Sequence, residues 1–227
     1  MPGWQAVYEE LRDRNFEVIT VAEDTRGAQD AGPWMTAARL PMDAPVRSPA
    51  PAERIRLTHT ALIDQEHLVS KLYNMVNVPT AVWINEQGRI VRPGETAYVD
   101  DRLTYIHGLK SASYLAALRD WAEKGEQSAY VFSEERLRER LAPPNPDWEM
   151  AAAEFGLGEQ LSRAGHLPEA IPHFKEAQRL NPESWNYKRQ AWLLSDSQRD
   201  YGTTFREEVA KLNGRRYYPA RDLPGER

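Results

Sequence analysis

The segment from Asn77 to Val91 constrains the fold of this chain more than any other. Within it, Pro79 precedes an apolar run over Ala81–Ile84, and the β-branched pair Ile90–Val91 follows a turn that contains Gly88. Two strand-like runs separated by a short glycine-containing turn predict a β-hairpin. Because proline cannot donate a hydrogen bond to a sheet, Pro79 must stand where the first strand begins. It is also a candidate for a cis peptide bond.

The composition is that of an ordinary globular protein, with 41% apolar and 28% charged residues among 227. That length suffices for one large domain or two small ones. A formal net charge of −5 and a pI near 5.6 argue against nucleic acid or a membrane surface as the partner. There is no apolar run of the ~18 residues that a membrane span needs, and no secretory signal at the N-terminus. The sequence therefore predicts a soluble, cytoplasmic protein.

The chain contains no cysteine. This excludes disulfide bonds, thiolate metal sites and thiol catalysis by the chain itself, although it does not fix the compartment. The sequence also has no glycine-rich phosphate loop and no nucleophile, histidine and carboxylate arrangement of a known type. We therefore predict no cofactor and no metal site.

Residues 1–125 are predicted to form an α/β domain in which helices and strands alternate. Apolar periodicity and turn residues predict, in order, a helix over 2–15, a strand over 16–22, a short helix within 28–40, an irregular proline-rich loop over 41–51, a strand over 60–63 ending at Asp64, a helix around 68–76, the hairpin, and a helix capped by Ser113 and closed by Gly125.

This order resembles the thioredoxin fold of thiol–disulfide reductases and related redoxins. The resemblance depends on Asp64 after a strand, Tyr73 in the next helix, and Asn77-Val78-Pro79-Thr80 directly before the hairpin. In that superfamily the loop around the proline faces a Cys-x-x-Cys motif and pairs with the backbone of the substrate. The resemblance therefore implies a substrate- or partner-binding loop formed by Val78, Pro79 and Thr80.

In the thioredoxin-like family a central strand ends in the Cys-x-x-Cys motif at the start of the first helix. Pro2 falls near a proline of that helix, so the strand and both cysteines would lie upstream of Met1. The missing strand would separate residues 16–22 from residues 80–85, and unpaired buried backbone groups cost ~1–3 kcal/mol each. We expect either a longer parent polypeptide or a redox-inactive protein whose gap is closed by rearrangement or by a strand from another chain.

Residues 126–227 are predicted to form a helical region with a tetratricopeptide-like hairpin over 148–182. It follows a charged helix over 133–141 and a linker over 142–147. Its positions match the 34-residue tetratricopeptide pattern at Leu157-Gly158, Gly165, Ala170, Phe174, Ala177 and Pro182, with departures at Glu154, Leu161 and Pro172. Fewer than about three repeats rarely stand alone. We therefore expect this region to pack on the α/β domain, with the tail at Tyr217–Tyr218 lying back over a surface.

The remaining polar residues have plain structural interpretations. Asp100–Asp101 could bind a metal but is better explained as a cap or a solvated loop, and Asp64 as the cap of the helix near Glu66. The seven tryptophans are interpreted mostly as core. The histidines show no ligand spacing and are interpreted as surface or turn residues: His59, His67, His107, His166 and His173.

Two functional hypotheses remain open. In the first, this chain is the body of a thiol–disulfide oxidoreductase whose cysteines lie upstream, and it is redox-inactive as it stands. In the second, it is a non-catalytic module that binds a protein or peptide partner through the Val78–Thr80 loop and the helical hairpin. An upstream Cys-x-x-Cys would favour the first and an upstream strand without cysteines the second; the oligomeric state stays open.

Overall fold

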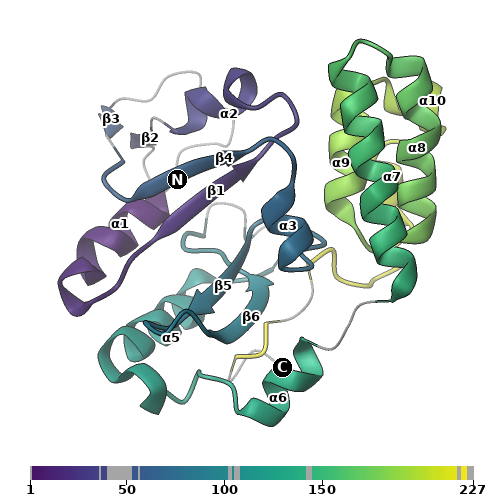
Figure 1. Cartoon of the computed structure of the whole chain (residues 1–227). Helices are drawn as coiled ribbons and strands as arrows, with labels where there is room; N and C mark the ends of the chain where they lie inside the picture. Colours follow the sequence, from purple (N-terminus) through teal and green to yellow (C-terminus); the bar gives the residue numbers. More distant parts are fainter. Residues whose placement is uncertain are drawn as a thin grey trace.

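The computed structural model describes residues 2–35, 37–39, 53–55, 57–101, 104, 108–141, 145–218 and 221–223. In this part of the chain a mixed α/β region with small sheets is followed by a largely helical region (Figure 1). The expected loop over 41–51, the first part of the expected linker (142–144) and His107 lie outside the described residues.

The α/β region alternates helices and strands, as expected. Its elements are α1 (Pro2–Leu11), a 3-10 turn (Arg12–Arg14), β1 (Ile19–Glu23), α2 (Ala28–Met35), β2 (Ala37–Arg39), β3 (Glu53–Ile55), β4 (Thr60–Asp64), α3 (Leu68–Leu72), β5 (Thr80–Ile84), β6 (Ile90–Thr96), α5 (Ser111–Lys124) and a second 3-10 turn (Gly125–Gln127).

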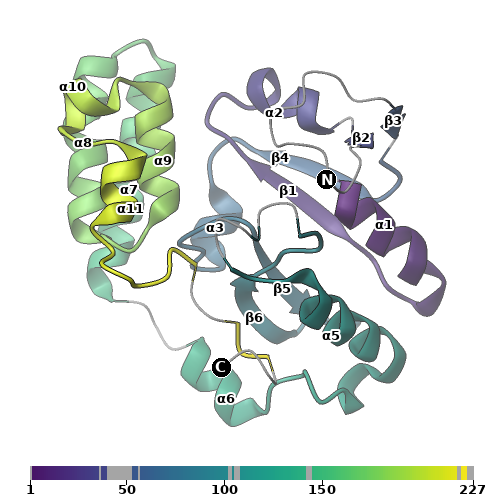
Figure 2. The same ribbon diagram turned by 180° about the vertical axis from the view of Figure 1, so that it is seen from behind.

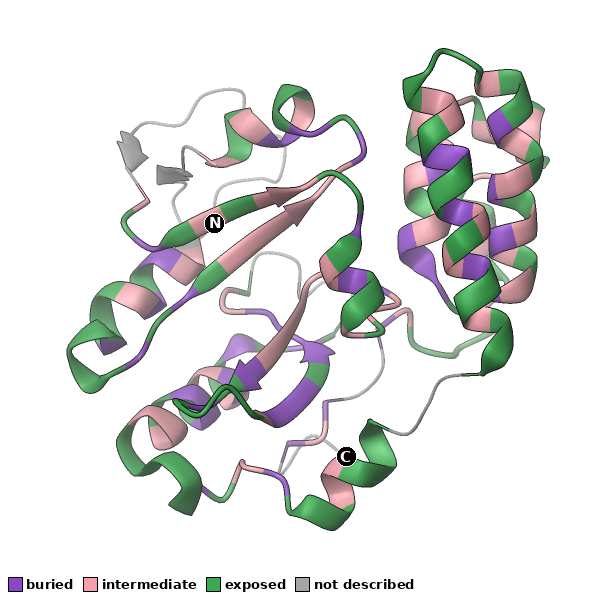
Figure 3. Cartoon of the chain, viewed as in Figure 1, coloured by how far each residue is buried: buried purple, intermediate pink, exposed green. Residues whose placement is uncertain are grey.

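The strands form three separate pairs rather than one sheet. β1 pairs with β4 in parallel, β2 with β3 and β5 with β6 antiparallel. Among the described strands none joins β1 to β5, and Figures 1 and 2 show the two pairs as neighbours. β1 and β5 therefore belong to separate two-stranded sheets. In Figure 3, β6 is largely buried, whereas β1 and β4 are intermediate or exposed.

The predicted hairpin is confirmed. β5 and β6 pair antiparallel with Thr80 opposite Thr96, and Gly88 in the turn has a φ of 73°. The side chain of Asn85 closes the turn by accepting hydrogen bonds from the backbone N–H of Gln87 (3.2 Å) and of Arg89 (2.9 Å). The Val78–Pro79 peptide bond is cis.

The main core lies between the hairpin, α1 and α5. The Trp83 ring stacks on Trp121 at 4.8 Å between centroids, and its Nε1–H donates to the hydroxyl of Tyr114. This arrangement meets the requirement that a buried indole N–H find a partner. The buried members are Val7, Leu11, Phe16, Val18, Trp83, Val91, Ala97, Tyr114, Ala117, Leu118 and, from the C-terminal tail, Leu223.

The helical region contains α6 (Glu134–Arg140), α7 (Pro146–Arg163), α8 (Leu167–Leu180), α9 (Trp185–Leu194), α10 (Ser197–Tyr201) and α11 (Phe205–Ala210). α7 and α8 form a helical hairpin. Gly158 lies directly against Phe174, because a Cβ placed on Gly158 would approach the ring to 2.7 Å. Phe174, Ala170 and Ala177 are fully buried, so small residues let these helices approach closely, as predicted.

Two local predictions were wrong. Ser113 does not cap α5, which begins at Ser111; Asp101 instead accepts a hydrogen bond from the Ser111 N–H at 2.7 Å. Trp34 is 74% exposed, which the interpretation of the tryptophans as mostly core allows. The helix expected around 68–76 is only Leu68–Leu72, and both terminal leucines are exposed.

The strand expected over 16–22 begins only at Ile19, although Phe16 and Val18 are buried before it. Burial of these two side chains, rather than a strand ladder, explains the apolar pattern there. None of the helices in the described ranges combines the length and apolar character that crossing a bilayer requires.

Candidate functional site

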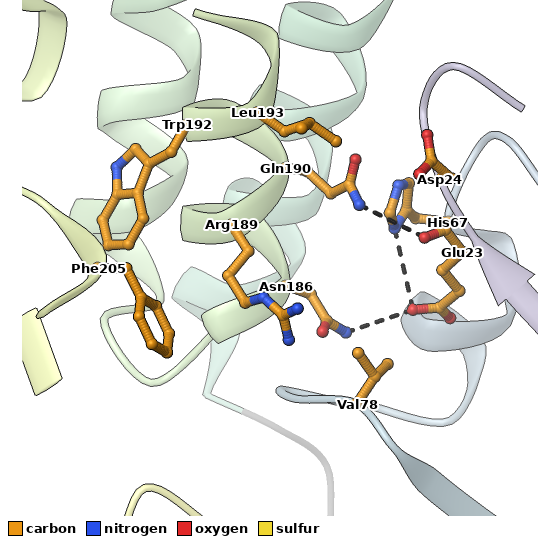
Figure 4. A pocket seen from close by; sticks show the side chains of 10 residues that line it. All are labelled: Glu23, Asp24, His67, Val78, Asn186, Arg189, Gln190, Trp192, Leu193 and Phe205. Atoms are coloured by element: carbon orange, nitrogen blue, oxygen red, sulfur yellow. Dashed lines mark hydrogen bonds and ion pairs between the residues drawn. The ribbon is translucent and has the colours of Figure 1, made fainter. Parts of the chain in front are cut away.

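A pocket of about 440 Å³ lies where the α/β region meets the helical region. One wall comes from the end of β1, from His67 and from the loop before β5; the opposite wall comes from α9 and the start of α11 (Figure 4). The lining residues are Glu23, Asp24, His67, Val78, Asn186, Arg189, Gln190, Trp192, Leu193 and Phe205.

Of the three loop residues singled out in the sequence, Val78 lines this pocket. Its backbone groups already have partners: the N–H donates to Asn77 Oδ1 at 2.9 Å, and the carbonyl accepts from the Tyr218 hydroxyl at 3.0 Å. Pro79 follows, and the Thr80 hydroxyl donates to the backbone carbonyl of Asn77 at 2.6 Å. The loop is thus held by its own side chains and by the tail.

The tail lies over the loop, which confirms the expectation for Tyr217–Tyr218. The Tyr217 hydroxyl donates to Asn77 Oδ1 at 3.3 Å, and Tyr218 packs edge-on against Tyr98. Figure 2 shows the tail running from α11 back toward the α/β region. The buried Tyr218 side chain explains why two adjacent tyrosines are tolerated near the end of the chain.

α9 docks directly on the α/β region, so the expectation that the helical region packs there is confirmed. Asn186 Nδ2 donates to the carbonyl of Met75 (2.9 Å) and to Glu23 Oε2 (3.4 Å). Gln190 Oε1 accepts from the N–H of Thr25 at 3.3 Å, and its Nε2 donates to the Glu23 carbonyl at 3.4 Å. Gln190 thus satisfies backbone groups at and just after the end of β1, and Asn186 satisfies the carbonyl of Met75, which fixes the position of the wall.

A row of buried ionisable groups runs beneath the pocket. His67 Nδ1 lies 3.9 Å from Glu23 Oε2, and His67 Nε2 lies 3.4 Å from Glu159 Oε1 on α7. The side chains of Glu23 and His67 are only 6% and 4% exposed. The Thr25 hydroxyl donates to Glu159 Oε1 at 2.7 Å.

Burial sets the protonation of this row. Burial is the largest cause of the raised pKa of Glu23, about 7, and of the raised pKa of Glu159, also about 7. Hydrogen bonds from Ser70 and Thr25, respectively, oppose the rise. Burial also lowers the pKa of His67 to about 4, so the imidazole is neutral near pH 7.

Two atoms of the row have no hydrogen-bond partner among the described residues: Glu23 Oε1 and His67 Nδ1. A neutral His67 with its proton on Nε2 can donate toward Glu159, which leaves Nδ1 as an acceptor. The pocket wall therefore presents acceptors that lack donors.

The histidine interpretation was wrong for two residues. His67 is buried in the row just described, and His59 is buried with its Nδ1 3.0 Å from Gln5 Oε1. His166 is exposed, whereas His173 pairs with Glu154 at 2.7 Å. Sequence spacing gave no signal for these pairs, because only the fold brings their partners together.

The interpretation of Asp64 is confirmed, since its carboxylate accepts from the N–H of Glu66 (3.2 Å) and of Val69 (2.7 Å) at the start of α3. Asp101 likewise serves as a cap, as described above. Within the described ranges no three His, Asp or Glu side chains are grouped as metal ligands would be.

Comparisons of this chain with protein-family models, with curated proteins and with solved structures found no match. The function must therefore be inferred from the pocket itself.

Proposed function

We propose that this chain is a thioredoxin-like binding module whose pocket takes an extended peptide between the Val78 loop and α9. One observation carries the proposal: Val78, from the loop that the resemblance identifies as the substrate contact, lines the pocket, and the helical region supplies the opposite wall. The pocket is of the size of many small-ligand sites, about 300–1,000 Å³.

The chemistry of the walls suits a peptide. Leu193 and Phe205 line the pocket and are large apolar side chains that remain exposed, a feature typical of interaction sites. The carbonyl of Val78 accepts its hydrogen bond from the Tyr218 hydroxyl, and a peptide N–H that enters the pocket would replace that hydroxyl as the donor. A peptide offers both apolar side chains and backbone donors.

The experiment is an NMR titration of the ¹⁵N-labelled protein with a mixture of unstructured random octapeptides. We expect amide shifts at Val78, Gln190 and Leu193. Leu193→Asp should weaken binding about tenfold, because it places a charge on the apolar wall. Leu141, directly after α6, is equally exposed (46% against 44%) but does not line the pocket, so Leu141→Asp is the matched control. Unchanged spectra, or equal losses in both variants, would count against the proposal.

A second candidate is the body of a thiol–disulfide oxidoreductase in a longer polypeptide. The separation of β1–β4 from β5–β6 favours it, because the cysteine-bearing strand of that family would fit between β1 and β5. The chain itself has no cysteine and cannot perform the reaction. Top-down mass spectrometry of the native protein tests this candidate. A longer chain with a Cys-x-x-Cys would support it, and a native chain that starts at Met1 would exclude it.

A further inference from the structure

The wall of the pocket that belongs to the α/β region is rich in acceptors and poor in donors. The Glu23 carboxylate accepts a hydrogen bond from Asn186 at Oε2 and is also hydrogen-bonded by Ser70, whereas Glu23 Oε1 and His67 Nδ1 have no hydrogen-bond partner among the described residues. Both side chains are more than nine-tenths buried and line the pocket, where Figure 4 shows them side by side. Buried acceptors without donors are costly, so a ligand that supplies donors would be stabilised here.

We propose that the pocket binds the basic side chain of a peptide, a lysine or an arginine, with Glu23 as its counter-ion. This inference rests on the proposed function and adds the class of side chain that the site selects.

A basic side chain fits both the polar and the apolar parts of the lining. An ammonium group has three donors and a guanidinium group five, and neither has an acceptor, so each complements Glu23 Oε1 and His67 Nδ1. The methylene stem of such a side chain packs on apolar surface while its charged end is paired. Val78, Leu193 and Phe205 supply that surface in this pocket.

The charges around Glu23 favour a cation on balance. Asp24 lies in the lining, and Asp64 acts on Glu23 as a further negative charge. Glu159 lies behind His67 and does not line the pocket; Arg163 on α7 opposes the rise in the pKa of Glu159 that burial causes.

Arg189 is the basic residue in the lining. Its charge acts on Tyr217 of the tail, where it opposes the rise in pKa that burial causes. It can repel a bound cation or attract an acidic ligand. An acidic side chain is therefore the competing occupant that the experiment must test.

Binding of a cation beside Glu23 stabilises the ionised carboxylate, so it should release a proton near neutral pH. The affinity for a basic peptide should therefore rise as the pH is raised through about 7, while a neutral peptide should show no such change.

The test uses three pentapeptides, acetyl-Gly-Val-X-Val-Gly-amide, in which X is lysine, norleucine or glutamate. Isothermal titration calorimetry of the full chain at about pH 8 should show the lysine peptide binding about tenfold more tightly than the norleucine peptide. Glu23→Gln should remove that difference between the lysine and norleucine peptides. Glu159→Gln is the matched control, because Glu159 is equally buried and also has a raised pKa but does not line the pocket.

The outcomes separate this inference from the proposed function. Equal binding of the lysine and norleucine peptides overturns the basic-side-chain inference and leaves peptide binding intact. Preference for the glutamate peptide, lost in Arg189→Gln, overturns it in favour of an acidic ligand. If no peptide binds, both proposals fail. Circular dichroism of each variant establishes that it is folded.

Discussion

The hydroxyl of Tyr218 donates a hydrogen bond of 3.0 Å to the carbonyl of Val78. A side chain from the C-terminal tail thus occupies one lone pair of the loop residue that lines the pocket. The backbone N–H of Val78 also has a partner, because it donates to the side-chain oxygen Oδ1 of Asn77. The tail and a peptide therefore compete for the same carbonyl.

Tyr218→Phe removes the hydroxyl and should increase the affinity for the lysine pentapeptide. A neutral hydrogen bond contributes about 0.5–1.5 kcal/mol, so we expect the dissociation constant to fall by about three- to tenfold. Calorimetric titration measures it. Tyr8→Phe on α1 serves as the control and should leave the affinity unchanged; a weaker complex with Tyr218→Phe would mean that the tail supports binding.

Glu159→Gln should stabilise the protein only at neutral and alkaline pH. Burial raises the pKa of Glu159 to about 7, so the folded state holds its proton more tightly than the unfolded state does. The stabilisation from this protonated carboxyl is complete below pH 4.5, the ordinary value, and is lost as the pH rises to about 7. Above that pH the variant should be more stable than the parent by on the order of 2–3 kcal/mol.

Urea unfolding at several pH values measures this difference. Near pH 5 the parent and the variant should be almost equally stable, because the parent then also buries a neutral group. The lowered pKa of His67 costs stability as the pH falls from 6.5 to about 4, but it does so in both proteins and cancels. A difference independent of pH would show that Glu159 is not protonated in the folded state.

Gly158→Ala should destabilise the α7–α8 hairpin. The new methyl group would meet the Phe174 ring at 2.7 Å, and overpacking of a core costs about 1–3 kcal/mol. Gly156→Ala is the matched control on the same helix, because apart from its chain neighbours and the nearby backbone of α7 itself nothing lies within 4 Å of its added Cβ. There the gain in helix propensity should stabilise by up to about 1 kcal/mol. Thermal unfolding of both variants gives the sign of each effect.

Arg92→Met should be strongly destabilising. The buried guanidinium pairs with Glu95 at 2.8 Å, and it also donates to the carbonyls of Tyr130 and Asp222. Removal of one partner from a buried pair costs about 3–5 kcal/mol. Arg89→Met offers the contrast, because its pair with Glu126 is exposed and should contribute at most about 1 kcal/mol. Equal losses of unfolding free energy in the two variants would refute the assignment.

The sequence predicted the hairpin turn, the helix cap at Asp64 and the α7–α8 contact, because the residues that form each of them lie close together in the chain. The turn of the β5–β6 hairpin is closed within the segment Asn85–Arg89, and Asp64 caps the helix that follows it. The close approach of Gly158 to Phe174 follows from a pattern within one helical hairpin. Ser113 failed as a predicted cap because the distant Asp101 takes that role.

The polar part of the site could not be predicted from the sequence. Glu23, His67 and Glu159 lie on separate elements, and only the docking of α7 and α9 on the α/β region buries them together. Their raised and lowered pKa values result from that burial. The sequence did identify Val78, because the feature that marks it, Pro79, is the next residue in the chain.

The separate strand pairs affect how the pocket responds to a ligand. Glu23 stands at the end of β1 and Val78 just before β5, so the α/β wall of the pocket combines parts of two separate hydrogen-bonded units. No ladder of the described strands ties these two parts together; α9 connects them instead, because Asn186 donates both to Glu23 and to the carbonyl of Met75, three residues before Val78. A shift of one strand pair against the other would therefore leave the backbone hydrogen bonds within β1–β4 and β5–β6 intact but would break the contacts of Asn186.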